Sequence, residues 1–120
     1  MKELQFYTLE EMKEYYDEKS KTYQFWDKDG TACSVSILFN LKQPNAKILC
    51  HNLSCLDIQV NTITAWDIDA CFMLSNQIIA HNIDAVDIYT KKLVIINDGE
   101  INAWGNIRSD SIKWERLTNW

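Results

Sequence analysis

Closely spaced carboxylates are the residues of this chain with the clearest potential for chemistry. Asp67 and Asp69 lie two residues apart, and Asp84 and Asp87 lie three apart. Two acids that share a pocket can perform general acid–base catalysis, as glycosidases do. No nucleophile, base and orienting group accompany these aspartates in the pattern that a hydrolase needs. We therefore expect solvated surface acids and no enzyme, with a small hydrolase as the least favoured of three function classes.

Four cysteines and two histidines are the residues that could bind a transition metal. The chain contains neither a CxxC pair nor an HxxxH pair, which are the spacings of many zinc sites. Cys55 follows Cys50 at the fifth position, which is the period of a repeat that runs through this region. A free cysteine behaves as a small apolar residue. We expect four free thiols, no metal and no other cofactor.

The elements that position these residues follow from that five-residue repeat. Steps of five from Ile48 to Leu93 meet an apolar residue at all ten positions. The residue two places further on is almost always small, and the fifth residue of the unit is Asn or Asp in six of the ten units. The ten apolar positions are Ile48, Leu53, Ile58, Ile63, Ile68, Met73, Ile78, Ile83, Ile88 and Leu93.

This spacing predicts a coil of very short strands. Residues two apart in an extended chain point to the same side, so the Ile and the small residue of each unit share one side. Because five is odd, the chain must turn a corner once per unit to keep every Ile inside. Asn and Asp suit such corners because they tolerate left-handed backbone angles. The pattern indicates a mainly β protein, a small right-handed parallel β-helix (solenoid) with about five residues per face.

The repeat is interrupted twice near the carboxyl end. Three extra residues, 98–100, precede a unit that begins at Ile101, and one extra residue, Asn106, precedes units that begin at Ile107 and Ile112. We expect 98–100 to form a loop in which Gly99 supplies an unusual backbone conformation. Three bulky residues are expected to close the open end of the stack: Trp114, Leu117 and Trp120.

Residues 1–44 have a different pattern. Thr8 and Glu11 form a capping-box sequence ahead of an apolar stripe, which predicts a helix over about 9–19. Residues 22–26 and 31–39 flank a turn sequence at 27–30 and predict a β-hairpin. We expect residues 1–44 to cap the amino end of a solenoid formed by 45–120, as one structural unit.

Composition narrows the function classes. The chain has 120 residues, 47% of them hydrophobic, which suits one small domain. Only three Gly and one Pro are present, which excludes a P-loop and a GxGxxG loop. The amino terminus carries acids where a signal peptide is apolar, and no run is long enough to span a membrane, so a cytoplasmic protein is expected. The net charge of −5 argues against direct binding to nucleic acid.

Two stretches of the repeat resemble a known kind of sequence. Residues 63–70 (ITAWDIDA) and 83–88 (IDAVDI) resemble the "DIDAWDINA" repeats of short proteins encoded by prophages and mobile elements of Gram-positive bacteria. The chain is also similar to pentapeptide-repeat proteins, which form square right-handed β-helices. That second resemblance implies four units per turn, so that residues 20 apart align and Trp66 lies above Val86.

The outward acids and Trp66 are the candidate binding residues. The candidate acids are Asp57, Asp67, Asp69, Asp84 and Asp87, and residues 48–97 have a net charge of −3. The resemblance to the prophage repeats implies a phage or mobile-element protein. The resemblance to pentapeptide-repeat proteins that target gyrase implies an inhibitor of a nucleic-acid-handling enzyme of the bacterial host, such as a CRISPR effector or a topoisomerase. Its acidic rod would occupy a basic groove of that host protein. Two alternatives stay open: acids that serve only solubility, and an assembly protein that self-associates, for example as a homodimer, through open ends or apolar outer residues.

Overall fold

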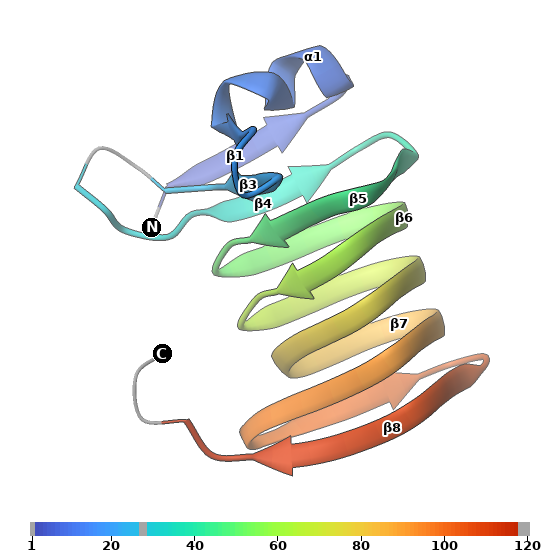
Figure 1. Cartoon of the computed structure of the whole chain (residues 1–120). Coiled ribbons are helices and arrows are strands. Elements are labelled where there is room, and N and C mark those ends of the chain that lie inside the picture. The colour runs from blue at the N-terminus through green and yellow to red at the C-terminus, as the bar shows by residue number, and fades with distance from the viewer. Residues whose placement is uncertain (1, 27–28, 118–120) are drawn as a thin grey trace.

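Parallel strands that coil on top of one another make up most of the molecule (Figure 1). This computed structural model describes residues 2–26 and 29–117, which form a mainly β solenoid of about five turns with one short helix near the amino end. The predicted parallel solenoid with an amino-terminal helix is confirmed. The elements are β1 (Glu3–Phe6), α1 (Leu9–Met12), a 3-10 turn η1 (Lys13–Tyr15), β2 (Tyr16–Asp17), β3 (Thr22–Gln24), β4 (Ser34–Ile37), β5 (Leu41–Leu49), β6 (Asn52–Thr64), β7 (Asp67–Ala103) and β8 (Ile107–Glu115).

Each turn of the solenoid has three sides rather than four. In the pairing of β6 with β7, Leu53 lies beside Ile68 and Ile63 lies beside Ile78, so residues 15 apart align. Fifteen residues hold three five-residue units, and the alignment of residues 20 apart is wrong. We call the sides first, second and third, in the order in which the chain passes through Leu53, Ile58 and Ile63 within one turn.

The interior of the solenoid is filled by the repeated apolar positions. All ten Ile-type residues from Ile48 to Leu93 are 0–3% exposed. Cys50, Cys55 and Ala65 occupy small positions of the same repeat and are also buried. Each turn therefore places three large and three small side chains inward, and these fill a narrow three-sided interior without the wider space that a fourth side would create.

The corner Asn and Asp residues act mainly through their side chains. Positive φ angles at corners of the repeat occur only at Asn97 (52°) and Asp98 (60°) among the described residues, so the prediction of left-handed corners is wrong for the others. Instead, Asn82 Nδ2 donates to Asp67 Oδ1 one turn away (3.1 Å). Asn76 Nδ2 likewise donates to Asn61 Oδ1 (2.9 Å). A short amide or carboxylate at a corner thus ties one turn to the next.

The interruption at 98–100 is absorbed within β7. Gly99 is needed for space, because a Cβ atom there would collide with the backbone carbonyl of His81, and its φ is not positive. The prediction that Gly99 supplies an unusual backbone conformation is wrong: the glycine allows two backbones to approach closely. With the three extra residues and Asn106, the last turn is offset by 19 residues, so that Ile88 lies beside Ile107.

The amino end of the solenoid is closed. Thr8 and Glu11 form the expected capping box, but α1 ends at Met12 and η1 follows, so the helix is shorter than predicted. The chain leaves the helical conformation because Tyr16 pairs with Tyr23 in an antiparallel ladder. Four aromatic rings then cover the end, with centroids 5.4 to 6.2 Å apart: Phe6, Tyr15, Tyr23 and Phe25.

The predicted hairpin around residues 27–30 is reduced to a single antiparallel bridge, Trp26 with Ala32. Its two arms separate instead: β3 pairs parallel with β5 on the third side, and β4 pairs parallel with β1 and β6 on the first side. Parallel pairing with the stack buries more apolar surface than an isolated hairpin can. Residues 27 and 28 of the turn lie outside the described residues.

The described residues, which end at 117, leave the carboxyl end of the solenoid open. Trp114 is 61% exposed and Leu117 is 39% exposed, so the prediction that they close the stack is wrong, and Trp120 lies outside the described residues. No helix of the described part is long and apolar enough to cross a membrane.

Candidate functional site

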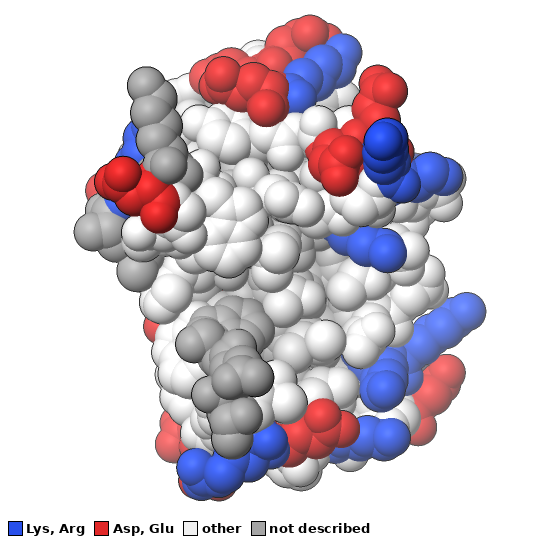
Figure 2. Space-filling view, turned by 60° about the vertical axis from the view of Figure 1, so that its left-hand side comes forward, with Lys and Arg blue, Asp and Glu red and all other residues white. Residues whose placement is uncertain are grey.

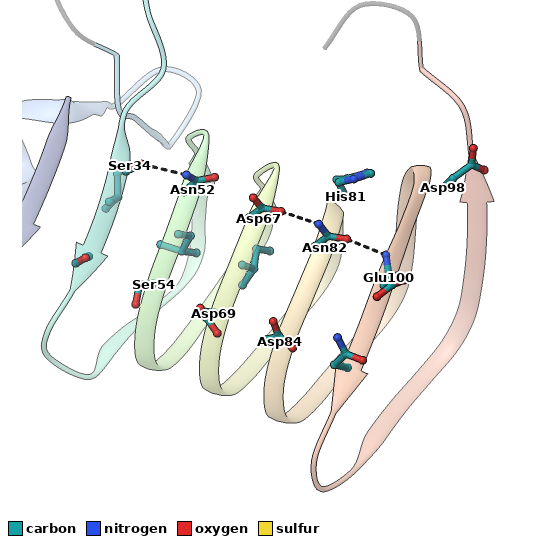
Figure 3. A pocket seen from close by; sticks show the side chains of 15 residues that line it. Ser34, Asn52, Ser54, Asp67, Asp69, His81, Asn82, Asp84, Asp98 and Glu100 are labelled. Carbon is teal, nitrogen blue, oxygen red and sulfur yellow. Dashed lines mark hydrogen bonds between the residues drawn. The ribbon is translucent and has the colours of Figure 1, made fainter. Parts of the chain in front are cut away.

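Two columns of polar side chains run along the first side of the solenoid (Figure 3). Every strand on this side points one residue of each column outward, because outward residues alternate with inward ones. The first column is Glu3, Ser34, Asn52, Asp67, Asn82 and Glu100. The second column is Gln5, Ser36, Ser54, Asp69, Asp84 and Asn102. We call these two columns together the acidic face.

The acidic face is hollowed and carries charge of one sign. Its middle turns line an open depression of ≈ 780 Å³, which Asp98 and His81 also border. None of the residues lining the depression is Lys or Arg. Short Ser, Asn and Asp side chains keep this side low, so a partner can approach the carboxylates directly.

Hydrogen bonds between turns hold the first column in place. Asn52 Nδ2 donates to Ser34 Oγ (3.1 Å), and Asn82 Nδ2 donates to Asp67 Oδ1 (3.1 Å). Asn82 Oδ1 in turn accepts from the backbone N–H of Glu100 (3.0 Å). The Asp69 and Asp84 side chains of the second column are exposed and point outward from adjacent turns (Figure 3). The first column is therefore fixed by its neighbours, while the second presents its carboxylates to solvent.

An aromatic ladder, His51, Trp66 and His81, lies at the corner where the third side meets the first. The Trp66 and His81 rings are stacked, with centroids 4.2 Å apart and planes at 15°, and His51 lies 6.5 Å from Trp66 on an adjacent turn. His81 Nδ1 lies 2.9 Å from the backbone carbonyl oxygen of Ile96, so Nδ1 carries the hydrogen. Trp66 is thus half-buried between two imidazoles and does not lie above Val86.

The corner that carries the aromatic ladder is poor in charge. It lies on the left of Figure 1, where β5 and β6 end, and it comes forward in Figure 2. Figure 2 shows few charged side chains in the middle of that face and most of them towards its two ends. The acidic face is therefore bounded on this side by a largely uncharged strip.

An exposed apolar column follows the opposite corner, where the first side meets the second. One residue from each turn contributes to it, at the position directly after the first-side strand. We call it the apolar ridge: Tyr7, Leu38, Leu56, Cys71, Val86 and Trp104. Its side chains are 40–81% exposed where a large hydrophobic residue is present. A continuous apolar column of this length on a surface is typical of a site of protein contact.

Three of the five predicted acids come together on the acidic face: Asp67, Asp69 and Asp84. The other two, Asp57 and Asp87, lie beyond the apolar ridge, beside the second side. Asp87 Oδ1 accepts from the backbone N–H (2.9 Å) and the side chain (3.4 Å) of Asn106, so it anchors the second chain interruption. One Asp57 oxygen is shielded from solvent and has no hydrogen-bond partner among the described residues.

Glu100, Asp98 and Glu3 are acids of this surface that the repeat did not reveal. Glu100 and Asp98 belong to the insertion that breaks the five-residue period, and Glu3 lies on β1, which precedes the repeat. Asp98 also pairs with Arg116. Glu100 lies 18 residues after Asn82, because the three inserted residues lengthen the 15-residue turn, and the regular five-residue period does not reveal this step.

The cysteines are free, as expected, and three of them are buried. Burial raises the pKa of Cys55 to about 12 and raises that of Cys50 further in the same direction. Cys71, on the apolar ridge, is exposed. Among residues 2–26 and 29–117, no group of three or more His, Cys, Asp and Glu side chains is arranged to hold a metal ion.

Comparison of the chain with protein-family models, with curated proteins and with solved structures finds no match.

Proposed function

We propose that this chain is a non-catalytic binding protein whose acidic face occupies a basic, nucleic-acid-binding groove of a partner protein. The observation that carries the proposal is the run of carboxylates along one straight, hollowed side that has no Lys or Arg in its depression. Such a surface attracts a positively charged groove and raises the rate of association with it. Inhibition follows, because the groove can then no longer hold its nucleic acid.

The charge density of the acidic face favours a groove that binds a single strand. The face extends over six adjacent strands, or about 24 Å at the usual strand spacing. It carries five carboxylates, those of Glu3, Asp67, Asp69, Asp84 and Glu100. Over about 24 Å a single strand carries roughly 7 phosphate charges and a duplex roughly 14. Five carboxylates are closer to the phosphate number of a single strand, so a groove that binds single strands is the better match.

The apolar ridge supports a protein as the partner. A nucleic acid or a free cation would gain little from six apolar side chains beside the charged columns, whereas a protein groove with an apolar rim would bury them. Trp104 is the most exposed of them at 81%, and exposed Trp residues are frequent energetic centres of interfaces. The acidic face would then attract the partner, and the ridge would hold it.

Capture experiments with matched charge variants test this proposal. The tagged chain is incubated with a bacterial lysate, and bound proteins are identified before and after elution with a single-stranded DNA oligonucleotide. We expect proteins that bind single strands, released by the oligonucleotide and by raised salt. The variant D69N/D84N should lose them, because it removes two exposed charges of the acidic face.

The control is E14Q/E18Q, which removes the same net charge from the amino-terminal cap, away from the acidic face. This variant should keep its captured proteins. The proposal is wrong if D69N/D84N captures the same proteins as the parent chain, or if neither the oligonucleotide nor salt displaces them.

A second function class, self-association, is favoured by a different observation. The last turn that the structure describes leaves core positions and a strand edge uncovered.

A further inference from the structure

The carboxyl end of the solenoid exposes side chains at positions that are buried elsewhere. Ile107, Ile112 and Trp114 are 41%, 46% and 61% exposed. The residues directly beside them on the preceding turn, Ile88, Leu93 and Ile95, are each 0% exposed. These three side chains therefore continue the core pattern into a place where no further turn covers them within the described residues.

The backbone of β8 is also an open edge. It pairs with β7 only, so its other side offers unpaired N–H and C=O groups among the described residues. Natural solenoids cover such an end, because an open edge with apolar neighbours recruits another strand. The amino end of this chain is covered by α1, η1 and the aromatic rings beneath them. Within residues 2–26 and 29–117, the solenoid thus has one closed end and one open end.

The charges along β8 identify a second copy of the chain as the occupant. Its outward side chains alternate in sign: Arg108, Asp110, Lys113 and Glu115. An antiparallel partner with the same sequence presents the reversed order, so Arg108 lies opposite Glu115 and Asp110 lies opposite Lys113 of the other copy. Opposite charges in directly facing pairs stabilise a ladder, and like charges destabilise it. This edge is complementary to itself even though the chain as a whole has a net charge of −5.

We propose that two copies of this chain associate end to end through antiparallel β8 strands, about a two-fold axis between Ser111 and Ile112. In that register Trp114 of each copy faces the small Ser109 of the other. Because the opposite end of the solenoid is closed, the contact cannot repeat, and the assembly stops at a dimer.

The position of the axis has a consequence for the acidic face. Residues 111 and 112 lie at the corner between the second and third sides, directly across the three-sided turn from the first side. A two-fold axis through that corner meets the first side at its middle. The acidic faces of the two copies then join into one continuous surface of twice the length.

Sedimentation equilibrium of the whole chain over a concentration series tests the dimer. We expect a mass that rises from 14.1 kDa to twice that value and no further. Trp114→Ala should raise the dimer Kd by about 30-fold or more, as loss of a central interface Trp does. Leu74→Ala removes an exposed apolar side chain from a middle turn of the solenoid, away from the carboxyl end and from the apolar ridge, and it should leave the Kd unchanged.

Charge exchange at two exposed positions tests the register and does not depend on the core. D110K and K113D each place like charges opposite each other twice per dimer and should each raise the Kd by about tenfold or more. The double variant D110K/K113D restores opposite signs at both places and should return the Kd to near its original value. Circular dichroism of each variant should match that of the parent chain.

Four results would overturn the proposal. The first is a parent chain that stays at 14.1 kDa at every concentration, which would mean that something other than a second copy covers the end. The second is a mass that keeps growing beyond two chains. The third is equal weakening by Leu74→Ala and Trp114→Ala, and the fourth is a double charge variant whose Kd is no lower than that of the single variants.

Discussion

Neutralising Asp84 should make the fold more stable, because the acidic face places like charges on adjacent turns. Asp69 and Asp84 occupy the second column on neighbouring turns and are both exposed (Figure 3). At a strand spacing of about 4.8 Å, two unit charges repel by about 0.9 kcal/mol at the dielectric constant of water and by about 3.5 kcal/mol at an effective value of about 20. Exposure places the pair near the lower figure.

We therefore expect Asp84→Asn to raise the free energy of unfolding by about 0.5–1 kcal/mol at low ionic strength. The amide keeps the shape of the side chain, so packing is unchanged. The measurement is urea unfolding followed by circular dichroism, at about 0.01 M and about 1 M salt, where the Debye length is about 30 Å and about 3 Å. The gain should be largest at low salt and should nearly vanish at high salt.

Asp87→Asn is the matched control, because it is the same substitution in an acid with a structural task. Asp87 Oδ1 accepts two hydrogen bonds from Asn106, and hydrogen bonds to a charged acceptor are stronger than those to a neutral one. This variant should lose about 0.5–1 kcal/mol. The reasoning fails if Asp84→Asn is destabilising, if its gain does not depend on salt, or if Asp87→Asn is equally stabilising.

Three further predictions concern the core, the insertion and the thiols. Leu53→Ala, at a residue 2% exposed, should cost about 2–5 kcal/mol in urea unfolding, whereas Leu56→Ala, at a residue 49% exposed on the apolar ridge, should cost less than about 1 kcal/mol. Equal losses would contradict the assigned sides of this strand. Gly99→Ala should cost about 1–3 kcal/mol and lower the Tm, because its new methyl group meets a backbone carbonyl; an unchanged Tm would remove the argument from close approach. At about pH 8 a thiol reagent should label Cys71 in the folded protein, whereas Cys55 should react only on unfolding, because burial raises its pKa to about 12. Rapid labelling of Cys55 at about pH 8 would contradict its burial. The stability contributed by that protonated thiol is full below its ordinary pKa of 9.0 and is lost as the pH rises towards about 12.

The inward positions of the repeat are predictable from sequence, because side-chain alternation is a local property. Every Ile-type residue from Ile48 to Leu93 is buried, and Cys50 and Cys55 are inside as the repeat requires. The number of sides is a different matter. A five-residue unit fits three or four corners per turn equally well, and the choice depends on how the inward side chains of one whole turn fill the interior.

The candidate surface was predictable where the repeat is regular. Asp67, Asp69 and Asp84 meet on one side because each belongs to an uninterrupted unit. Asp57 and Asp87 were assigned to the same rod, but a three-sided turn places them around a corner. Glu100 was not predicted as part of the surface, because three inserted residues shift it relative to the regular five-residue repeat. No local pattern shows which earlier turn an interrupted strand will pair with.

A turn of this solenoid starts and finishes at the same corner, so whole turns are interchangeable units of length. Residues 67–81 carry two acids and no Lys or Arg, and both acids belong to the acidic face. A tandem copy of these 15 residues would lengthen the surface by one step of about 4.8 Å and two negative charges, while both ends of the molecule stayed as they are. The length of the acidic face can therefore be matched to longer or shorter grooves in steps of whole turns. Inserts of other lengths are accommodated at corners, as at 98–100 and 106.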